Sequence, residues 1–164
     1  MNLRGKKILI VSDTHGRIGN FKDVLRKVSP VDMLIHCGDV EGQEEEIKAL
    51  AGCEAHIVSG NNDYFSTLPR EEEFEIGPYK VFLTHGHGYG VSFGTERIIE
   101  EAESRGVDVV IFGHTHKPLN EKVGNLRVLN PGSLSYPRQE GRDPSFMLME
   151  FDQFGKMFCG ISYL

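Results

Sequence analysis

The chain carries the stretch KILIVSDTHG at residues 7–16, in which a run of aliphatic and β-branched residues leads directly into Asp13 and His15. A continuous apolar run of this length is typical of a strand that is buried on both faces, as in a parallel sheet. Two side chains that can bind a metal therefore follow the end of a predicted inner strand. The chain repeats this arrangement at four further places.

Four more polar clusters each follow an apolar stretch that is predicted to form a strand. They are Gly38-Asp39, Gly60-Asn61-Asn62-Asp63, His85-Gly86-His87 and Gly113-His114-Thr115-His116. In open sheets with parallel strands, ligands gather beyond the carboxyl ends of the strands. We therefore expect loops from five separate strands to bring aspartate, asparagine and histidine side chains to one edge of the fold.

The first third of the chain alternates predicted strands with predicted helices. Strands are expected at residues 7–12, 32–37 and 54–59 because these runs are mainly apolar. Between them, Phe21, Val24, Leu25 and Val28 have helical spacing and are followed by Pro30, and residues 44–50 form a second helix with Ile47 and Leu50 facing inward. This β-α-β-α-β order predicts parallel pairing with right-handed crossovers.

The rest of the chain contains mostly strands. We expect a hairpin that turns at residues 77–78, a helix at 95–104, a buried strand at 107–112, a loop at 130–133, and a final strand pair at 146–151 and 157–162. The predicted fold class is therefore α/β with α+β character: a two-sheet β-sandwich of largely mixed sheets, flanked by helices. Residues 1–164 are expected to form a single domain.

The bulk composition is that of an ordinary globular protein. Of the 164 residues, 39% are hydrophobic and 26% are charged. The net charge of −6 argues against dedicated nucleic-acid binding, which usually requires a basic stripe. No apolar run approaches a membrane span, and the apolar residues 8–11 are too few for a signal peptide, so we expect a cytoplasmic protein with no membrane partner.

The clustered donors predict a site for two divalent metal ions. Asp13 and His15 are one residue apart, as are His114 and His116, and Asp39 adds a further carboxylate. Oxygen and imidazole donors suit manganese, iron, zinc or nickel rather than calcium. A carboxylate shared by two ions holds them roughly 3.5–4 Å apart, and the water between them becomes a hydroxide that can attack phosphorus.

These motifs resemble those of the calcineurin-like metallophosphoesterase superfamily, and most closely its short branch of YfcE-type phosphodiesterases. The resemblance covers essentially the whole chain and implies a two-sheet sandwich flanked by helices. It also implies that Asp39 bridges the two ions. The ligands it implies for one ion are Asp13, His15 and His116, and those for the other are Asn61, His85 and His114.

One position departs from the pattern of the superfamily. Many members carry a histidine after the asparagine, and that histidine helps to protonate the leaving group; here the position is Asn62. An amide can orient a phosphate oxygen but cannot act as a general acid at neutral pH. His87 lies two residues from a predicted ligand and has three open roles: to replace that histidine in part, to hydrogen-bond a metal-bound water, or only to support a metal ligand.

Other polar residues receive structural predictions. His36 and His56 lie in the middle of predicted strands and are expected to be core histidines with hydrogen-bond partners. Asp63 is expected to stabilise a turn or to orient a histidine. Arg17 and Lys117 adjoin the metal motifs, and we expect them to face solvent rather than a phosphate.

The predicted function is a metal-dependent phosphodiesterase or phosphatase that acts on a small phosphate ester. Two alternatives remain open. One is a binding scaffold with the same fold and little catalysis, as the retromer subunit of this fold suggests. The other is a nucleotide-specific phosphatase, for which Tyr64, Phe65, Tyr89 and Phe93 could stack on a base. Because relatives often pair, we also expect a homodimer or higher oligomer.

Overall fold

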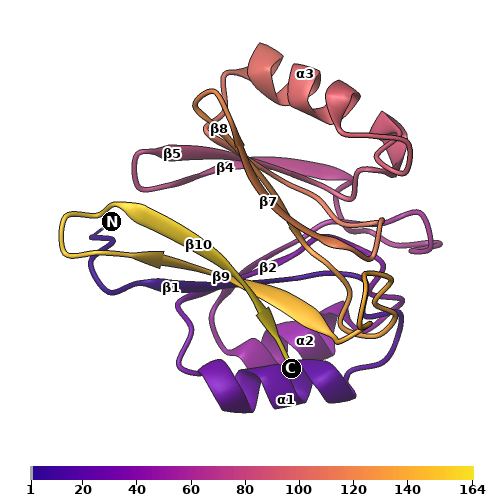
Figure 1. Cartoon of the computed structure of the whole chain (residues 1–164). Coiled ribbons are helices and arrows are strands. Elements are labelled where there is room, and N and C mark those ends of the chain that lie inside the picture. The colour runs from indigo at the N-terminus through magenta and orange to yellow at the C-terminus, as the bar shows by residue number, and fades with distance from the viewer. Residues whose placement is uncertain (1) are drawn as a thin grey trace.

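The computed structural model describes residues 2–164, which form two five-stranded sheets and three α-helices (Figure 1). The strands are β1 Lys7–Val11, β2 Met33–His36, β3 Glu54–Ile57, β4 Glu71–Ile76, β5 Tyr79–Thr84, β6 Val109–Ile111, β7 Pro118–Val123, β8 Leu126–Pro131, β9 Ser145–Phe151 and β10 Met157–Tyr163. The helices are α1 Gly19–Val28, α2 Glu44–Ala51 and α3 Glu96–Arg105, and a short 3₁₀ turn spans His87–Tyr89.

Each sheet contains three neighbouring parallel strands together with two strands that are joined by antiparallel pairing. The first sheet has the order β10-β9-β1-β2-β3, in which β1, β2 and β3 are parallel and β9 and β10 are antiparallel to their neighbours. The second sheet has the order β4-β5-β6-β8-β7, in which β5, β6 and β8 are parallel and β4 and β7 form antiparallel edges. The mixed sheets of the prediction are confirmed.

The molecule is layered as helix, sheet, sheet and helix. One hydrophobic cluster fills the space between the sheets and includes Ile10, Ile35, Leu83, Ile111 and Met147. A second cluster joins the first sheet to α1 and α2, and a third joins the second sheet to α3. Figure 1 shows the three helices on the two outer faces, with the sheets packed between them. The predicted sandwich flanked by helices is therefore correct.

The helices follow the predicted apolar faces, with one exception. Phe21, Val24, Leu25 and Val28 are the buried residues of α1, and the helix ends just before Pro30. In α2 the prediction for Leu50 is wrong, because its side chain is 41% exposed while Ile47 is fully buried. A helix of two turns presents one narrow stripe to the sheet. Residue 51, at i+4 from Ile47, lies on that stripe, whereas residue 50 lies beside it.

Element ends differ from the prediction at three places that matter for the site. The strands expected at 54–59 and 107–112 are shorter, at Glu54–Ile57 and Val109–Ile111. The loop expected at 130–133 is partly strand, because β8 continues to Pro131. Within residues 2–164 no helix is long and apolar enough to cross a membrane.

Candidate metal centre

The carboxyl ends of the inner strands from both sheets meet at one edge of the sandwich. His85 Nδ1 lies 2.7 Å from the carbonyl oxygen of Cys37, and the backbone N–H of His114 donates to Asp13 Oδ2 at 3.1 Å. Both contacts join the loop of one sheet to the loop of the other. The seven predicted metal ligands are therefore brought together: Asp13, His15, Asp39, Asn61, His85, His114 and His116.

Three of these residues form a tight group. Asp13 Oδ1 lies 3.1 Å from His116 Nε2 and 3.5 Å from His15 Nε2. The two imidazole nitrogens are 3.1 Å apart. Their candidate ligand atoms all lie within 4.8 Å of one another, which is compact enough to surround one cation.

A second group lies beside the first, with Asp39 between them. His114 Nδ1 lies 3.1 Å from Asn61 Oδ1 and 3.3 Å from His85 Nε2. Asp39 Oδ2 is 3.4 Å from His85 Nε2 and 3.7 Å from His15 Nε2. One carboxylate oxygen thus faces both groups, which is the geometry that a bridging ligand requires. Asp13, Asp39 and His85 also form a compact triad.

The hydrogen bonds of two histidines fix which nitrogen faces the centre. His116 Nδ1 lies 2.7 Å from the carbonyl oxygen of Tyr136, and His85 Nδ1 lies at the same distance from that of Cys37. A carbonyl oxygen can only accept, so each Nδ1 carries a proton and each Nε2 faces the centre. Second partners of this kind are typical of metal-binding histidines.

The inward-facing atoms of the centre lack enough donors to satisfy them. Asp13 Oδ2 accepts from the Ser12 hydroxyl and from the His114 N–H, but Asp13 Oδ1 is buried and has no hydrogen-bond donor among residues 2–164. This oxygen instead faces the nitrogens of His116 and His15. Buried acceptor atoms that face one another without donors destabilise a folded protein, and a bound cation removes this free-energy penalty because it interacts with all of them. The residues present therefore fit a divalent metal.

The charges of the centre favour ionised carboxylates. Burial alone would raise the pKa of Asp13, but the nitrogens of His116 and His15 outweigh burial and hold this pKa well below its usual value. For Asp39 the opposing effect of burial is likewise outweighed, here by His85 and by the N–H groups of Asn62, so its pKa is lowered. Both carboxylates are available as anionic ligands across the physiological range.

The histidines respond to the same carboxylates. Burial disfavours charging of His85 and His15, yet Asp39 and Asp13 raise the pKa of His85, and Asp13 raises the pKa of His15. His114 differs: burial and then the neighbouring His85 charge lower its pKa. In the absence of metal, the carboxylates therefore favour protonation of His85 and His15, and a metal ion competes with those protons.

Five of the seven candidate ligands have a left-handed backbone. The φ angles are 54° for Asp13, 48° for His15, 59° for Asp39, 71° for His114 and 59° for His116. Non-glycine residues rarely adopt this region, and each costs of order 1–3 kcal/mol unless the surrounding structure compensates. Strain of this kind gathers at functional sites, because it aims side chains in directions that regular backbone does not allow.

Close packing around the carboxylates explains two of the glycines. A Cβ on Gly113 would lie 2.1 Å from Ser12 Oγ and 2.7 Å from Asp13 Oδ2, and one on Gly60 would lie 2.1 Å from Asp39 Oδ1. Neither glycine has a positive φ angle. Their role is therefore to leave room for a carboxylate.

The two predicted catalytic residues lie at different parts of the centre. Asn62 donates from its backbone N–H to Asp39 Oδ1 at 2.9 Å and from Nδ2 to Asp39 Oδ2 at 3.0 Å, so its amide faces the shared carboxylate. His87 is exposed, with its ring centroid 5.4 Å from that of His85 and 6.1 Å from that of His114. Burial and the His85 charge lower the pKa of His87.

Asp63 has a different role from one of those predicted. It orients no histidine among the described residues; instead its carboxylate accepts from the backbone N–H groups of Asp39, Glu41 and Gly60, each at 2.7 Å. Three donors converge on one side chain because the loops after β2 and β3 run side by side at the rim. Asp63 therefore ties the Asp39 loop to the Asn61 loop, and the predicted turn role is confirmed.

The two mid-strand histidines fall outside the centre. His36 is fully buried, accepts from the Gly38 N–H at Nδ1 and lies 3.1 Å from Thr14 Oγ1, and burial lowers its pKa to about 4. It is the satisfied core histidine that was predicted. For His56 the predicted core position is wrong: it is only half-buried, because β3 is an edge strand. Its ring stacks on Phe74 at 3.8 Å, and its Nδ1 lies 2.7 Å from Glu72 Oε2, so the predicted hydrogen-bond partner is present.

Asn130, near the end of β8, and Ser133, just after it, support the centre; for residues 130–133 the sequence left open whether they border the site or only form a turn. Asn130 is buried and donates to Gly113 O and to Thr115 Oγ1, which holds the loop of His114 and His116. Ser133 donates its hydroxyl proton to Asp13 O at 2.8 Å. The available signal was the same one that identified the ligands, since β8 is another parallel strand followed by polar residues.

A profile of the calcineurin-like phosphoesterase superfamily domain matches residues 7–153. The chain therefore belongs to the calcineurin-like phosphoesterase superfamily, as the motifs predicted. Among its relatives, phosphodiesterase YfcE of Escherichia coli strain K12 is 37% identical over an alignment of 171 positions, which covers 89% of this chain and 88% of that protein. The predicted likeness to YfcE-type phosphodiesterases is confirmed.

Two solved structures share the fold over nearly the whole chain. A predicted phosphoesterase from Streptococcus pneumoniae has a TM-score of 0.78 and 25% identity, and the match covers 97% of this chain and 98% of that one. Wild-type Vps29 from Entamoeba histolytica, complexed with zinc, has a TM-score of 0.76 and 26% identity, with 96% and 98% covered. The two-sheet sandwich is thus the fold of both.

Proposed function

We propose that residues 1–164 form a single domain that hydrolyses small phosphate esters, foremost phosphodiesters, with two divalent metal ions. The observation that carries this proposal is the buried, donorless Asp13 Oδ1 among imidazole nitrogens, next to a second group joined to it by Asp39. Membership of the superfamily and the likeness to phosphodiesterase YfcE support the phosphoester substrate.

Each residue has a proposed part in the reaction. Asp13, His15 and His116 hold one ion, Asn61, His85 and His114 hold the other, and Asp39 is shared. When bound, the ions supply Lewis acidity and a water of lowered pKa at this edge of the sandwich. The donor set suits manganese, with iron, zinc or nickel as alternatives.

Asn62 and His87 act around this core. Asn62 positions the shared carboxylate through its two hydrogen bonds to Asp39. His87 lies beside the second group, where its imidazole N–H can donate to the leaving oxygen. Its lowered pKa leaves it neutral at pH 7, so we expect efficient turnover only for esters with good leaving groups.

The test is hydrolysis of bis(4-nitrophenyl) phosphate with added manganese. The Asp39→Ala and His114→Ala variants are expected to lose turnover by at least about a hundredfold, because each removes a ligand on which the reaction depends. The His56→Ala variant is the control, since it removes an imidazole that lies away from the centre. Equal turnover in wild type and both ligand variants would remove the proposal.

The scaffold alternative has a separate readout. The likeness to Vps29 is the observation that favours it. Elemental analysis of protein purified without chelator distinguishes the two: the phosphoesterase is expected to hold close to two transition-metal ions per chain, and the scaffold well below one. The retention of all seven donors in one cluster supports the enzyme.

A further inference from the structure

Basic side chains gather on one side of the metal centre, although the chain as a whole is acidic. A cavity of about 650 Å³ opens next to His15 and His116, and it is lined by Lys117, Arg138 and Arg142 together with Tyr136 and Pro137. The net charge of the chain is −6. The three basic side chains around this cavity therefore make it locally positive although the chain has a net negative charge, and the positive potential lies beside the proposed catalytic ions.

The cations of this cavity are free of carboxylate partners. Neither Lys117, Arg138 nor Arg142 forms an ion pair within residues 2–164, whereas Arg105 pairs with three glutamates on the far side of the second sheet. Arg17 adds a fourth positive charge, because its guanidinium lies 5.0 Å from the centre of the Tyr136 ring, and it too has no acidic partner in this part of the chain. Basic side chains that line one cavity and have no acidic partner are available to bind an anionic ligand.

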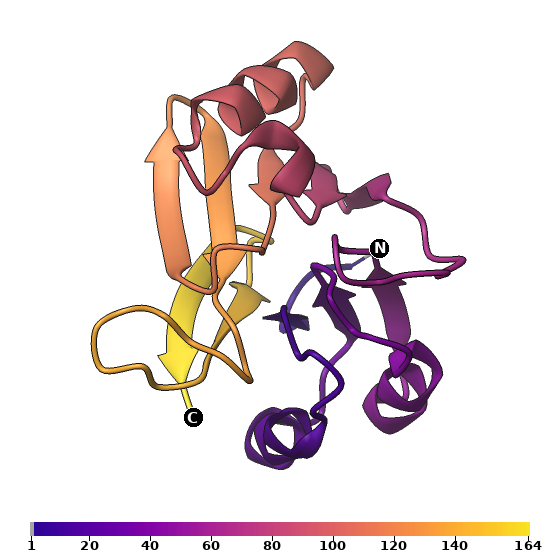
Figure 2. The same cartoon turned by 90° about the vertical axis from the view of Figure 1, so that its right-hand side faces the viewer.

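The loop that carries two of these arginines is fixed to the metal motifs. It spans residues 132–144 between β8 and β9 and lies at the rim in Figure 2. Ser135 Oγ donates to Thr14 O at 2.7 Å, and the backbone N–H of Arg138 donates to His116 O at 2.9 Å. Tyr136 O accepts from His116 Nδ1. The loop is thus bonded to the motifs of both sheets, and its cations are held next to the centre.

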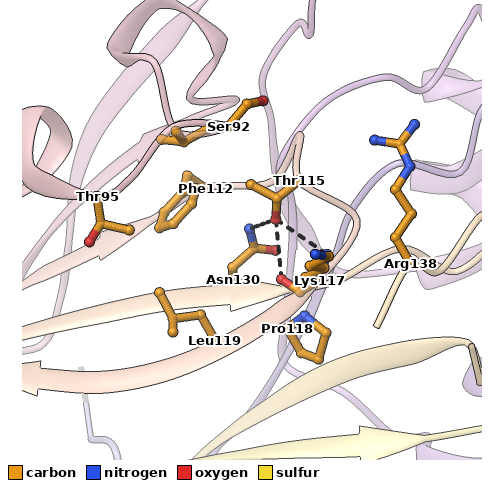
Figure 3. A pocket seen from close by; sticks show the side chains of 10 residues that line it. Ser92, Thr95, Phe112, Thr115, Lys117, Pro118, Leu119, Asn130 and Arg138 are labelled. Atoms are coloured by element: carbon orange, nitrogen blue, oxygen red, sulfur yellow. Dashed lines mark hydrogen bonds between the residues drawn. The ribbon is translucent and has the colours of Figure 1, made fainter. Parts of the chain in front are cut away.

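A second cavity adjoins the first and shares Lys117 and Arg138 with it. Its volume is about 480 Å³, and Figure 3 shows these two cations at one end with Phe112 and Leu119 at the other. Asn130 and Thr115 line it between these two ends, and Asn130 Nδ2 donates to Thr115 Oγ1 at 3.0 Å. A site with cations at one end and apolar side chains at the other suits an organic group that bears a negative charge.

We propose that this side of the centre binds a second oxyanion of the substrate, so that the substrate is a phosphate ester whose organic part carries another phosphate or a carboxylate. This inference rests on the proposed phosphoesterase function and names the class of its substrate. Arg138 and Arg142 bind the second oxyanion, and the apolar wall of the adjoining cavity contacts the organic part. Guanidinium groups are the usual partners for such anions, because their paired N–H donors match two oxygens.

The test compares three esters that share one leaving group. They are 4-nitrophenyl phenyl phosphate and its analogues with a carboxylate or a phosphonate on the phenyl ring. For the manganese-loaded wild type, we expect kcat/KM for the charged analogues to exceed that for the parent ester by about five- to tenfold at low salt. The carboxylate and phosphonate arms show which oxyanion is preferred.

The variants show whether the cavity causes this preference. Arg138→Gln/Arg142→Gln is expected to bring the ratio close to one while turnover of the parent ester remains. Arg70→Gln is the matched control, because Arg70 is also exposed but lines a cavity on the opposite side of the centre with Asn61 and His87. A ratio near one in the wild type, or an equal fall in the control, would overturn the inference.

A failure of the proposed function is distinguishable from a failure of this inference. If no ester is turned over with manganese, iron, zinc or nickel, the proposed function fails, and calorimetric binding of pyrophosphate to the metal-free protein decides the inference. Binding at least about threefold weaker in the double variant than in Arg70→Gln supports the cationic cavity. Equal or undetectable binding overturns it.

Discussion

Replacement of Asp13 by asparagine should stabilise the metal-free protein at high pH while it removes metal binding. Asp13 Oδ2 already accepts from Ser12 and from the His114 N–H, and an amide oxygen in that place keeps both bonds. Asp13 Oδ1 has no donor and lies 3.1 Å from His116 Nε2. An amide nitrogen in its place donates to the His116 lone pair, because His116 Nδ1 is engaged by Tyr136 O.

The size and sign of this effect follow from the groups involved. One new hydrogen bond and one fewer buried unsatisfied oxygen together contribute about 1–2 kcal/mol. For a chain of this length, that raises Tm by roughly 3–6 °C at about pH 9, well above the ordinary histidine pKa. At about pH 5.5 the sign should reverse. The raised pKa values of His15 and His85 stabilise the fold fully below the ordinary histidine pKa, and the Asp13→Asn variant would lack the negative charge that raises them.

Thermal unfolding of chelator-treated Asp13→Asn and wild-type protein, followed by circular dichroism at both pH values, measures the effect. Manganese at about a hundred times its Kd should then stabilise the wild type by about 2.7 kcal/mol per ion and leave the variant unchanged. A variant that is less stable than the wild type at both pH values, or one that manganese stabilises equally, would refute the reasoning about converging acceptors.

Three further outcomes are expected. Gly113→Ala should lower the free energy of unfolding by at least about 2 kcal/mol in chemical denaturation, because its Cβ overlaps Ser12, whereas Gly160→Ala, which meets no atom within 4 Å, should change it by less than about 1 kcal/mol. Metal binding should release protons and strengthen as pH rises through the raised pKa of His85, as calorimetry in buffers of different ionisation enthalpy would show; pH-independent affinity would contradict this. Asp63→Asn should cost about 1.5–3 kcal/mol, since three backbone N–H groups lose a charged acceptor, and unchanged thermal stability would show that the bonds contribute little.

The strand-end motifs were predictable because each is a local signal. A run such as residues 7–12 identifies a buried strand on its own, and the rule that ligands gather at the carboxyl ends of parallel strands then places Asp13, Asp39, Asn61, His85 and His114 at one edge. The two mixed sheets and the helices that flank them follow from the same local pattern together with the resemblance of the motifs.

The supporting contacts were not predictable, because their partners are distant in the chain. Ser133 bonds to Asp13 across 120 residues, and His116 to Tyr136 across a strand, a turn and a second strand. The partners of Asp63 are backbone N–H groups, which carry no sequence signal. Leu50 was predicted to face inward from helical spacing alone. That spacing does not show how much of the helix surface the neighbouring sheet covers.

Both proposed ligand groups draw donors from each side of the sandwich. Asp13 and His15 follow a strand of the first sheet while His116 follows a strand of the second, and Asn61 faces His85 and His114 in the same way. A cation held by either group would therefore be bound by residues of both sheets and would link the two sheets at this edge. The apolar layer between the sheets could then separate only after the cation is released. The ions proposed for the chemistry would thus also slow the unfolding of the protein.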